Sequence, residues 1–339
     1  MTPPVELTEL DRRVISTIQA AFPIKARPYA VLAEELGSTE VDVLTSVRRM
    51  KADGIIRRIG AMFDSHRLGY RSTLCAIAVP EERVEDVAAL IGEYHNVTHN
   101  YEREDHYNVW FTLIAPSEGR IEVILDEIAE KTGIDDILDL PAIRLFKIKV
   151  DFDLTGEQEQ RTEAPPIIKP AEIEPVHFNR EEKALARLLQ ADLPLVERPF
   201  AEVARILLEC GYDVDEQWVL ERTAAWVDSR VIRRFGAAIR HHRTGFSANA
   251  MGVWSCLEER VEEVGQIMAS FNEVSHCYER PTAPTWPANL YTMIHGRTRE
   301  EVGAVAESIR GATGLEAPRL LYSVREFKKA SMKYFAEGD

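Results

Sequence analysis

Two copies of one short motif contain the residues best suited to chemistry. The first copy is His99-Asn100-Tyr101-Glu102-Arg103, and the second is His276-Cys277-Tyr278-Glu279-Arg280. Side chains alternate along a β-strand, so an extended His-x-Tyr-x-Arg run places histidine, tyrosine and arginine on one face. Such a face offers an imidazole that exchanges protons near pH 7, a hydroxyl and a fixed cation. The motif therefore predicts a site for an anionic ligand.

A second motif precedes each copy. Ile56-Arg57-Arg58-Ile59-Gly60-Ala61 comes before the first, and Ile232-Arg233-Arg234-Phe235-Gly236-Ala237 before the second. The chain is therefore a tandem duplication whose most reactive side chains lie within the repeated motifs.

The first part of each repeat has the pattern of a winged helix-turn-helix. We expect Thr8 to cap a first helix, a second helix to run from Tyr29 to Leu36 and end at Gly37, and Ser38 to cap a third. The arginine pairs then lie on the β-wing. In the second repeat Asn179 takes the position of Thr8.

The following segment changes to strand periodicity. The expected strands and helices in the first repeat are Thr73–Val79, Glu81–Tyr94, Val97–Arg103, Tyr107–Ile114, a helix around Ile121–Ile128, and Ala142–Val150. That order, βαββαβ, is the ferredoxin-like unit. The fold class is α+β, and the expected domains are residues 1–62 and 177–238 (winged helices), 63–152 and 239–339 (ferredoxin-like), and a proline-rich linker at 153–176.

The composition limits the kind of protein and the partners that the chain can have. The 339 residues are 45% hydrophobic and 29% charged, with a net charge of −15. Met1 to Leu10 contain no signal-peptide pattern, and no segment approaches the roughly 20 apolar residues of a membrane span. The four cysteines form no CxxC pair, so we expect a reduced cytoplasm and no metal framework. The acidic balance disfavours nucleic acid and anionic membranes as partners.

These repeats resemble the Lrp/AsnC architecture, a winged helix followed by a ligand-sensing ferredoxin-like domain. The paired Ile-Arg-Arg-x-Gly-Ala and His-x-Tyr-x-Arg motifs are similar to those of the siroheme decarboxylases, some of which are fusions of two related subunits. The resemblance covers nearly the whole chain outside the linker. The winged-helix part is shared with many regulators, whereas the doubled motifs are more specific.

The resemblance implies a non-oxidative reaction on siroheme. Two acetate side chains lose carbon dioxide and become methyl groups, giving 12,18-didecarboxysiroheme on a route to heme d1 or heme. It implies no cofactor beyond the iron tetrapyrrole substrate and no protein-bound metal. We also expect the two ferredoxin-like domains to pair within one chain, imitating a dimer, and a further homodimer is compatible with the sequence.

For this reaction we expect His99 and His276 to be the acids that protonate the reacting carbons. The alternative is a structural histidine bonded to neighbouring backbone. Tyr101 and Tyr278 are expected to donate to a carboxylate or to support the histidine, the alternative being half-buried packing.

Arginines are the expected anchors of the remaining carboxylates. Arg103 and Arg280 fit that role, unless they pair with the adjacent glutamate or with a neighbouring domain. One arginine of each wing pair, Arg57-Arg58 and Arg233-Arg234, is expected to face the ligand pocket, since successive strand residues point in opposite directions. Lys147 and Lys328 are equivalent and are interpreted as solvated edge-strand lysines.

The repeats differ after the second motif. His106 follows the first copy, and Trp286 follows the second on a proline-rich loop. Both are candidate substrate contacts: the indole would cover a macrocycle face or else cap the core. His295 also has no counterpart in the other repeat. This asymmetry indicates that the two repeats no longer do identical work.

The alternatives are a DNA-binding regulator and a heme carrier or sensor without catalysis. The two expected recognition helices discriminate against the regulator. Residues 38–53 hold Arg48, Arg49 and Lys51 against three acidic residues, and residues 213–228 hold only Arg222 against five. A net negative helix loses the phosphate attraction that dominates DNA affinity. Two unequal winged helices also lack the symmetry of palindromic operators.

Overall fold

The computed structural model describes residues 7–148, 164–239 and 248–336, and these form two compact units. Among the described residues, the first unit comprises 7–68, 175–239 and 333–336. The second comprises 69–148, 164–174 and 248–332. Each unit therefore combines the equivalent parts of both repeats, which confirms the α+β tandem duplication.

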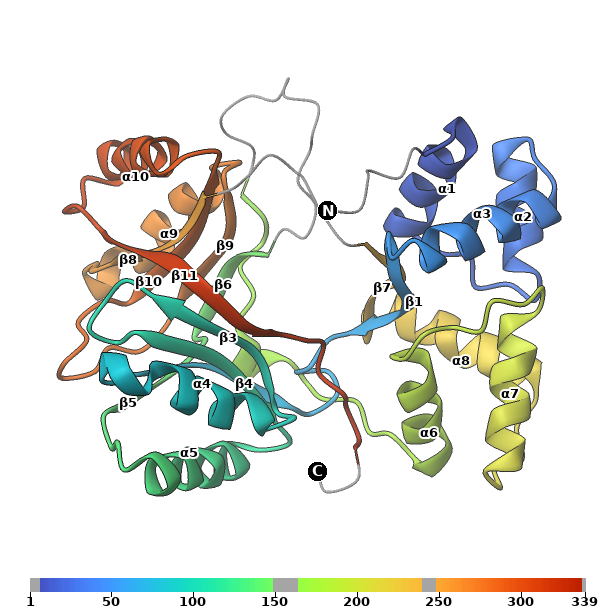
Figure 1. Cartoon of the computed structure of the whole chain (residues 1–339), viewed down its shortest axis with the longest axis horizontal. Coiled ribbons are helices and arrows are strands. Elements are labelled where there is room, and N and C mark those ends of the chain that lie inside the picture. The colour runs from blue at the N-terminus through green and yellow to red at the C-terminus, as the bar shows by residue number, and fades with distance from the viewer. Residues whose placement is uncertain (1–6, 149–163, 240–247, 337–339) are drawn as a thin grey trace. The chain divides into compact units, whose positions relative to one another are not determined.

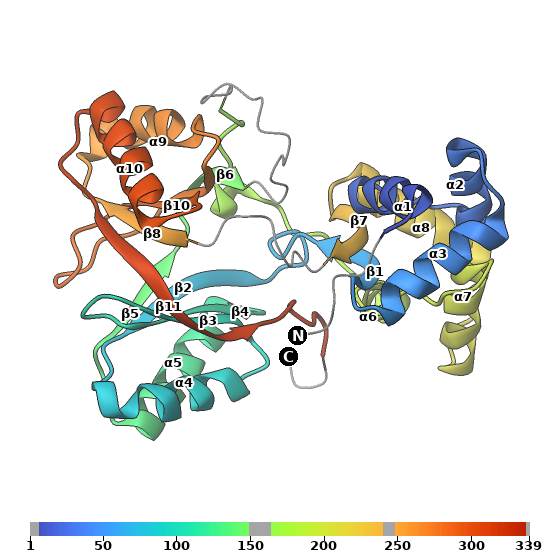
Figure 2. The same cartoon turned by 45° about the horizontal axis from the view of Figure 1, so that its top comes forward.

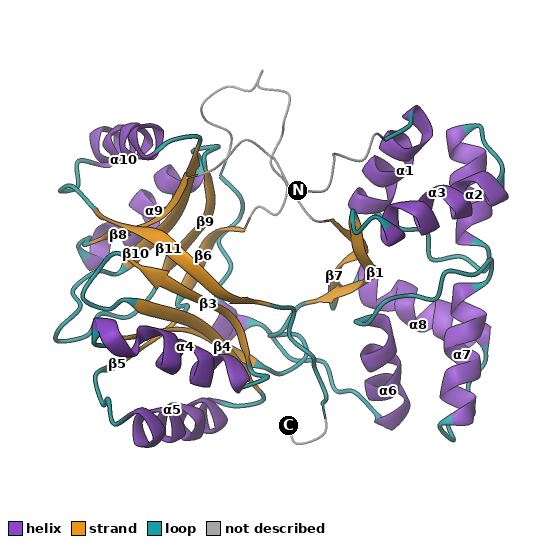
Figure 3. Cartoon of the chain, viewed as in Figure 1, coloured by secondary structure: helices purple, strands orange, loops and turns teal. Residues whose placement is uncertain are grey.

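The first unit contains the two winged helices (Figures 1 and 3). Its first copy consists of α1 (Glu9–Ala20), α2 (Pro28–Leu36), α3 (Glu40–Ala52) and the wing strand β1 (Ile56–Phe63). Its second copy consists of α6 (Arg180–Leu189), α7 (Pro199–Glu209), α8 (Glu216–Asp228) and the wing strand β7 (Ile232–Ile239).

Helix caps follow the sequence signals at the start of each copy. Thr8 and Asn179 are both N-caps with reciprocal capping boxes, as predicted. The prediction that Ser38 caps the third helix is wrong by one residue. Thr39 is the cap, because its hydroxyl accepts the Asp42 N–H at 3.2 Å.

The two wings pair with each other in an antiparallel ribbon centred on Gly60 opposite Gly236. Each glycine packs against the C-terminal end of the other repeat's first helix. A Cβ atom at Gly60 would lie 2.4 Å from the Ala191 carbonyl oxygen, and one at Gly236 would lie 2.6 Å from that of Ile18. No larger side chain fits at that approach. The glycine of the repeated wing motif is therefore explained by the pairing of the two repeats.

The second unit contains the ferredoxin-like domains. The first repeat contributes β2 (Arg71–Ile77), η1 (Glu81–Arg83), α4 (Val84–Glu93), β3 (Val97–Arg103), β4 (Val109–Ala115), α5 (Glu118–Thr132), β5 (Ile137–Pro141) and β6 (Arg144–Ile148). The second contributes β8 (Ala248–Trp254), η3 (Glu258–Arg260), α9 (Val261–Ala269), β9 (Val274–Glu279), β10 (Leu290–Gly296), α10 (Arg299–Thr313) and β11 (Arg319–Lys329). The short helix η2 (Pro170–Glu172) lies in the predicted linker.

The strands form one nine-stranded sheet in the order β5-β2-β4-β3-β11-β8-β10-β9-β6. Each repeat sends its last strand to the other. The start of β11 pairs with β8 of its own repeat, and the rest, from Ser323 on, pairs with β3 of the first repeat. Likewise β5 pairs with β2, while β6 crosses to β9. Figures 1 and 2 show β11 running between β3 and β8. The predicted pairing of the ferredoxin-like domains within one chain is confirmed.

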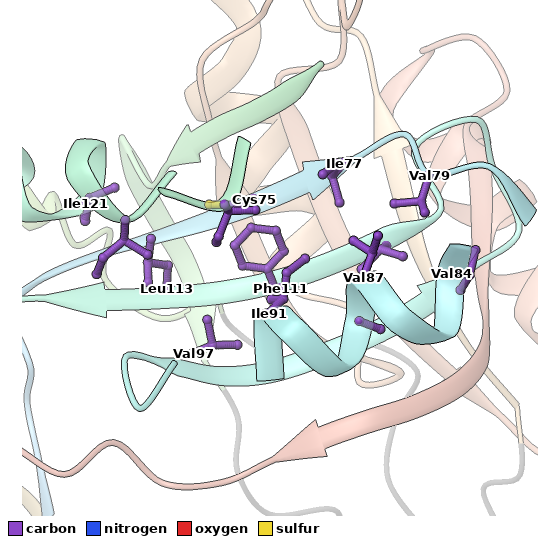
Figure 4. Close-up of a cluster of buried hydrophobic side chains, with 14 of the residues drawn as sticks. Cys75, Ile77, Val79, Val84, Val87, Ile91, Val97, Phe111, Leu113 and Ile121 are labelled. Atoms are coloured by element: carbon purple, nitrogen blue, oxygen red, sulfur yellow. The ribbon is translucent and has the colours of Figure 1, made fainter. Parts of the chain in front are cut away.

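Three apolar clusters hold this unit together. One lies between α4, α5 and the first repeat's strands, where Phe111, Cys75 and Ile91 meet (Figure 4). The second is its equivalent around α9 and α10. The third joins the inner sheet faces of both repeats and includes Trp110 and Trp286. Burial of this shared cluster favours association of the repeats.

The last strand of the first repeat differs from prediction. The expected strand Ala142–Val150 is observed as β6, a further strand that was not expected, β5, precedes it and ends at Pro141, and residues 149 and 150 lie outside the described part of the chain. Pro141 cannot donate to a ladder, and the chain changes partner there.

Two further assignments need correction. Lys147 lies on the edge strand β6 as expected but is buried, and Lys328 is partly buried on the inner strand β11. Their Nζ atoms donate to the carbonyls of Phe271 (2.6 Å) and Gly92 (2.7 Å), at the ends of α9 and α4 in the opposite repeat. Residues 333–336 were predicted to continue the second ferredoxin-like domain. They belong instead to the winged-helix unit, because Tyr334 packs on Phe63 there.

Of the predicted linker, residues 153–163 lie outside the described ranges. Ile168 exchanges main-chain hydrogen bonds with Leu145 of β6, and the Val176 N–H donates to the Arg67 carbonyl. Among the described residues, no helix is long and apolar enough to cross a membrane.

Candidate functional site

The first His-x-Tyr-x-Arg motif forms β3, and its three side chains share one face as predicted. The rings of His99 and Tyr101 are stacked with centroids 6.3 Å apart, and the Arg103 guanidinium lies 5.6 Å from the Tyr101 centroid. Asn100 points to the other face, where its amide donates to the Ala88 carbonyl of α4. The strand alternation inferred from sequence is therefore confirmed.

The second copy, on β9, repeats this geometry. The centroids of His276 and Tyr278 are 6.1 Å apart, and the Arg280 guanidinium lies 4.7 Å from the Tyr278 centroid. In both copies the histidine and tyrosine are partly exposed while the arginine is buried. Each motif thus presents an accessible imidazole and phenol beside a cation held in the interior.

The buried arginines donate to main-chain carbonyls of the opposite repeat. Arg103 Nη1 donates to the Leu321 carbonyl at 3.0 Å and to Ser323 Oγ at 3.1 Å. Arg280 donates to the Leu140 carbonyl. Burial lowers the pKa of both guanidinium groups, although arginine keeps its charge in proteins. These contacts use one nitrogen of each guanidinium, Nη1, so a contact of Arg103 or Arg280 with substrate carboxylates stays a prediction.

The glutamate before each of these arginines also contacts the opposite repeat. Glu102 accepts from Arg325 of β11 at 2.6 Å, and Glu279 pairs with Arg144 of β6 at 3.1 Å. These arginines occupy equivalent positions on the exchanged strands. The motif therefore divides into His and Tyr, which face accessible space, and Glu and Arg, which fasten the two repeats together.

We predict that Arg103→Ala and Arg280→Ala act mainly on stability. Each removes a buried donor and leaves a carbonyl unpaired, which typically costs about 1–3 kcal/mol in free energy of unfolding. The matched control is Arg310→Ala, which removes an exposed i,i+3 ion pair with Glu307 and should cost about 0.5 kcal/mol or less. Chemical denaturation and titration with the expected anionic ligand measure both effects. Unchanged stability with weakened ligand binding would instead support the carboxylate-anchor role.

A hydroxyl stands directly before each histidine, a feature that the sequence reasoning missed. His99 Nδ1 lies 3.0 Å from Thr98 Oγ1, and His276 Nδ1 lies 2.8 Å from Ser275 Oγ. The strand register shifts at both positions, so the hydroxyl residue is the extra residue of a β-bulge. The signal was in the sequence, because Thr98 and Ser275 occupy the same place in the two motifs.

The tyrosines have different neighbours in the two repeats. Tyr101 donates its phenol to Glu326 of β11 at 3.0 Å, and burial together with this carboxylate raises the pKa of Tyr101. The tyrosine is therefore a protonated donor at neutral pH. Tyr278 faces Leu145 at the equivalent position of β6. The predicted asymmetry of the repeats is thus present beside the motifs.

His295 adds a second imidazole to the second repeat. Its Nε2 atom lies 2.8 Å from Ser275 Oγ. Burial, with a smaller contribution from the charge of Lys329, lowers the pKa of His295 to about 4. Lys329 also lies opposite His99 in the β3–β11 pair. Lys329 of the second repeat is therefore paired with the first motif's histidine at this end of the sheet.

The wing arginines occupy the other unit. Arg58 Nη1 donates to the Gln190 carbonyl at 3.0 Å, and Arg234 Nη1 to the Gln19 carbonyl at 2.7 Å. These bonds cap the first helix of the opposite repeat, so Arg58 and Arg234 are structural there.

The outer wing arginines are more exposed. Arg233 is 3.4 Å from Asp64, and the side chain of Arg57 is exposed. The alternation of each pair is as predicted. A substrate contact by Arg57 or Arg233 stays a prediction.

His106 and Trp286 lie at the far ends of the motif strands from His99 and His276. His106 is exposed, 3.8 Å from Asp136. Trp286 is buried in the cluster between the repeats and donates its indole N–H to the Tyr291 hydroxyl at 2.7 Å. The structure therefore places the indole in the core, the second of its two expected positions. Neither residue is brought to the motif histidines.

No group of three or more His, Cys, Asp or Glu side chains in the described ranges is arranged to hold a metal ion. The side chains that can exchange protons beside the two motifs are the imidazoles, phenols and hydroxyls just described.

Family comparisons cover both parts of each repeat. A model described as the siroheme decarboxylase NirDL-like HTH domain matches residues 11–57 and 182–233, and one described as an AsnC-like ligand binding domain matches 67–147 and 243–328.

Individual relatives and a solved structure point to the same family as the first of these models. A siroheme decarboxylase of Hydrogenobacter thermophilus is 38% identical over 96% of this chain and 95% of its own length. The alpha subunit of a siroheme decarboxylase of Nitratidesulfovibrio vulgaris is 53% identical over 42% of this chain and 81% of its own length. A crystal structure of the siroheme decarboxylase NirDL in co-complex with an iron-uroporphyrin III analogue has 35% identity and a TM-score of 0.75, covering 97% of this chain and 95% of that one.

Proposed function

The chain belongs to the siroheme decarboxylase family, and we propose that its two histidine motifs are where acetate groups of siroheme lose carbon dioxide. The protein is a carboxy-lyase whose reaction is the non-oxidative removal of two acetate carboxyl groups from siroheme. The product is 12,18-didecarboxysiroheme, an intermediate for heme d1 or heme. Its two repeats correspond to the separate subunits of relatives and form an intramolecular pseudo-dimer.

The chemistry requires a positioned acid. When carbon dioxide leaves an acetate attached to the ring, the electron pair of the broken bond remains on the substrate. A proton must then reach the carbon that becomes a methyl group. Imidazole suits this step because its pKa is near neutrality.

The observation that carries the assignment is the partly exposed imidazole that each repeat presents at the same place. His99 and His276 each have Nδ1 within hydrogen-bonding distance of a buried hydroxyl. That bond orients the ring, and the other ring nitrogen, Nε2, is the proposed atom for proton transfer. Tyr101 and Tyr278, stacked on the histidines, are proposed to donate to a substrate carboxylate or to support the ring.

The proposal requires no cofactor beyond the iron tetrapyrrole itself, which is the substrate. It places the protein in the reduced cytoplasm, and the four cysteines, which form no disulfide, support this. A further homodimer of the whole chain is compatible with it.

The direct test is anaerobic incubation of the purified protein with siroheme, followed by mass spectrometry. We expect a product lacking two carboxyl groups and release of two equivalents of carbon dioxide. Binding of siroheme without any loss of mass would favour the alternative of a heme carrier or sensor.

The competing function, a DNA-binding regulator, is disfavoured by the contacts of the recognition helices. On α3, Arg48 donates to the Leu195 carbonyl at 3.0 Å, Arg49 pairs with Asp11, and Lys51 with Asp192. The single basic residue of α8 lies 3.2 Å from Glu182. All of these cations are used within the winged-helix unit, which leaves little charge for phosphates.

We therefore predict that DNA binding is absent at physiological salt. Fluorescence anisotropy with labelled duplexes from the protein's own genomic neighbourhood should show no saturable binding in the range of about 10⁻⁸–10⁻¹¹ M typical of specific readers. Nanomolar binding to a defined operator would refute this prediction and would support the function of a DNA-binding regulator.

A further inference from the structure

A chain of three side chains connects two histidines in the second repeat. Ser275 is the bulge residue of β9 and is 1% exposed. Its Oγ atom lies 2.8 Å from His276 Nδ1 and 2.8 Å from His295 Nε2. A serine hydroxyl both donates and accepts, so it can bond with both rings at once. The two imidazoles are thus joined through one buried hydroxyl.

The first repeat has only part of this chain. Thr98 contacts His99, but the position of His295 is occupied by Ile114. The two positions are equivalent because the Ile114 N–H donates to the Asn96 carbonyl as the His295 N–H donates to that of Glu273. The first repeat therefore supplies the hydroxyl without a second imidazole.

His295 has the properties of a relay group. It is partly exposed, so water reaches it, and burial of most of its ring lowers its pKa to about 4. The ring is therefore neutral at physiological pH, with one N–H and one accepting nitrogen. A neutral imidazole can take a proton at one nitrogen while giving one up at the other.

We propose that Ser275 and His295 are positioning residues that orient His276 and return to it the proton it transfers to the substrate carbon. This inference rests on the proposed function. On this proposal only the second repeat contains side chains that return a proton to its histidine. The rates of the two decarboxylations are therefore limited by different steps.

The carboxyl group that reacts at His276 is lost by a balanced series of transfers. The C–C bond to the carboxylate breaks, carbon dioxide leaves, and the carbon takes the proton of His276 Nε2. The Ser275 hydroxyl proton moves to His276 Nδ1, and the Nε2 proton of His295 moves to Ser275 Oγ. Solvent water, as hydronium, supplies one proton to His295 Nδ1. One proton is consumed and one carbon dioxide is formed, with no oxidant or reductant.

Two variants test the relay, each with a matched control. Ser275→Ala removes the hydroxyl, and Ser275→Thr restores the one that the first repeat uses. His295→Ile installs the residue of the first repeat, and Ile114→Val is a mild change at the same position of that repeat. Single-turnover reactions with siroheme, resolved by mass spectrometry, give the rate of each decarboxylation. Spectroscopic titration gives the siroheme affinity.

We expect Ser275→Ala and His295→Ile to slow one of the two steps about 10–100-fold, as removal of an orienting partner does for metal-bound histidines. The singly decarboxylated tetrapyrrole should accumulate if the slowed step is the second, and unreacted siroheme should remain if it is the first. The siroheme affinity should be unchanged. Ser275→Thr should recover most of the rate, and Ile114→Val should match the wild type.

Wild-type rates of both steps in both variants would overturn the relay. Equal slowing of both steps together with weakened siroheme binding would also overturn it, because that pattern indicates a structural role. Failure of the wild-type protein to release carbon dioxide would instead contradict the proposed function, so the two failures are distinguishable.

Discussion

His99→Ala and His276→Ala should each lower the single-turnover rate of siroheme decarboxylation by about 10²–10⁴-fold, the usual contribution of a general acid. Siroheme binding should change far less. The reason is that a partly exposed imidazole can donate a proton, whereas each buried arginine beside it donates to a main-chain carbonyl of the opposite repeat. The rates are measured by mass spectrometry and the binding by spectroscopic titration.

The two histidine variants need not be equally slow, since the hydroxyl beside His276 is bonded to a second imidazole and the hydroxyl beside His99 faces an isoleucine position instead. His177→Ala is the control, because His177 is exposed and lies outside both motifs. If both motif variants turned over at the wild-type rate, the acid role would be wrong. Tyr101, Tyr278 and His106 would then be the next acids to test.

Residues 1–153 expressed alone should give a self-associating or unstable fragment. Without the second repeat, β3 loses its pairing with β11, and the inner sheet face that contains Trp110 loses its apolar partner. Arg103 also loses its acceptor carbonyl at Leu321. The fragment can recover these contacts only by exchanging its own last strand with another copy.

Size-exclusion chromatography with light scattering and thermal unfolding measure this outcome. The complete chain serves as the control. A first repeat that was stable, monomeric and fully active would show that the exchange of strands is dispensable.

Local signals predicted much of the fold. The hydroxyl and amide caps at Thr8 and Asn179 and the alternation of Val97–Arg103 depend on residues close in sequence, and the structure agrees with them. The third helix is capped by Thr39 rather than Ser38, because two adjacent residues can both cap and only the backbone conformation decides between them.

Local sequence signals do not reveal a hydrogen-bond acceptor that lies in the other repeat. A buried lysine such as Lys147 and a solvated lysine look alike in sequence, because they differ only in whether a carbonyl at a helix end accepts the hydrogen bond of the ammonium group. Arg58 and Arg103 were read as ligand anchors for the same reason: guanidinium suits a main-chain carbonyl as well as a carboxylate. The acceptors in each case come from the opposite repeat.

The site itself was predicted in part. Repetition identified His99 and His276, and strand alternation placed each tyrosine beside its histidine. The hydroxyls at Thr98 and Ser275 were missed because a β-bulge, which alternation does not predict, turns them toward the imidazole.

The most direct test of the central claim is anaerobic turnover of siroheme in D₂O, with the deuterium content of each new methyl group measured by mass spectrometry and NMR. Protons on imidazole and hydroxyl groups exchange with solvent. If these groups supply the protons, the product should lack two carboxyl groups, and each of the two new methyl groups should contain one deuterium. A product without carboxyl loss, or methyl groups formed without solvent deuterium, would contradict it.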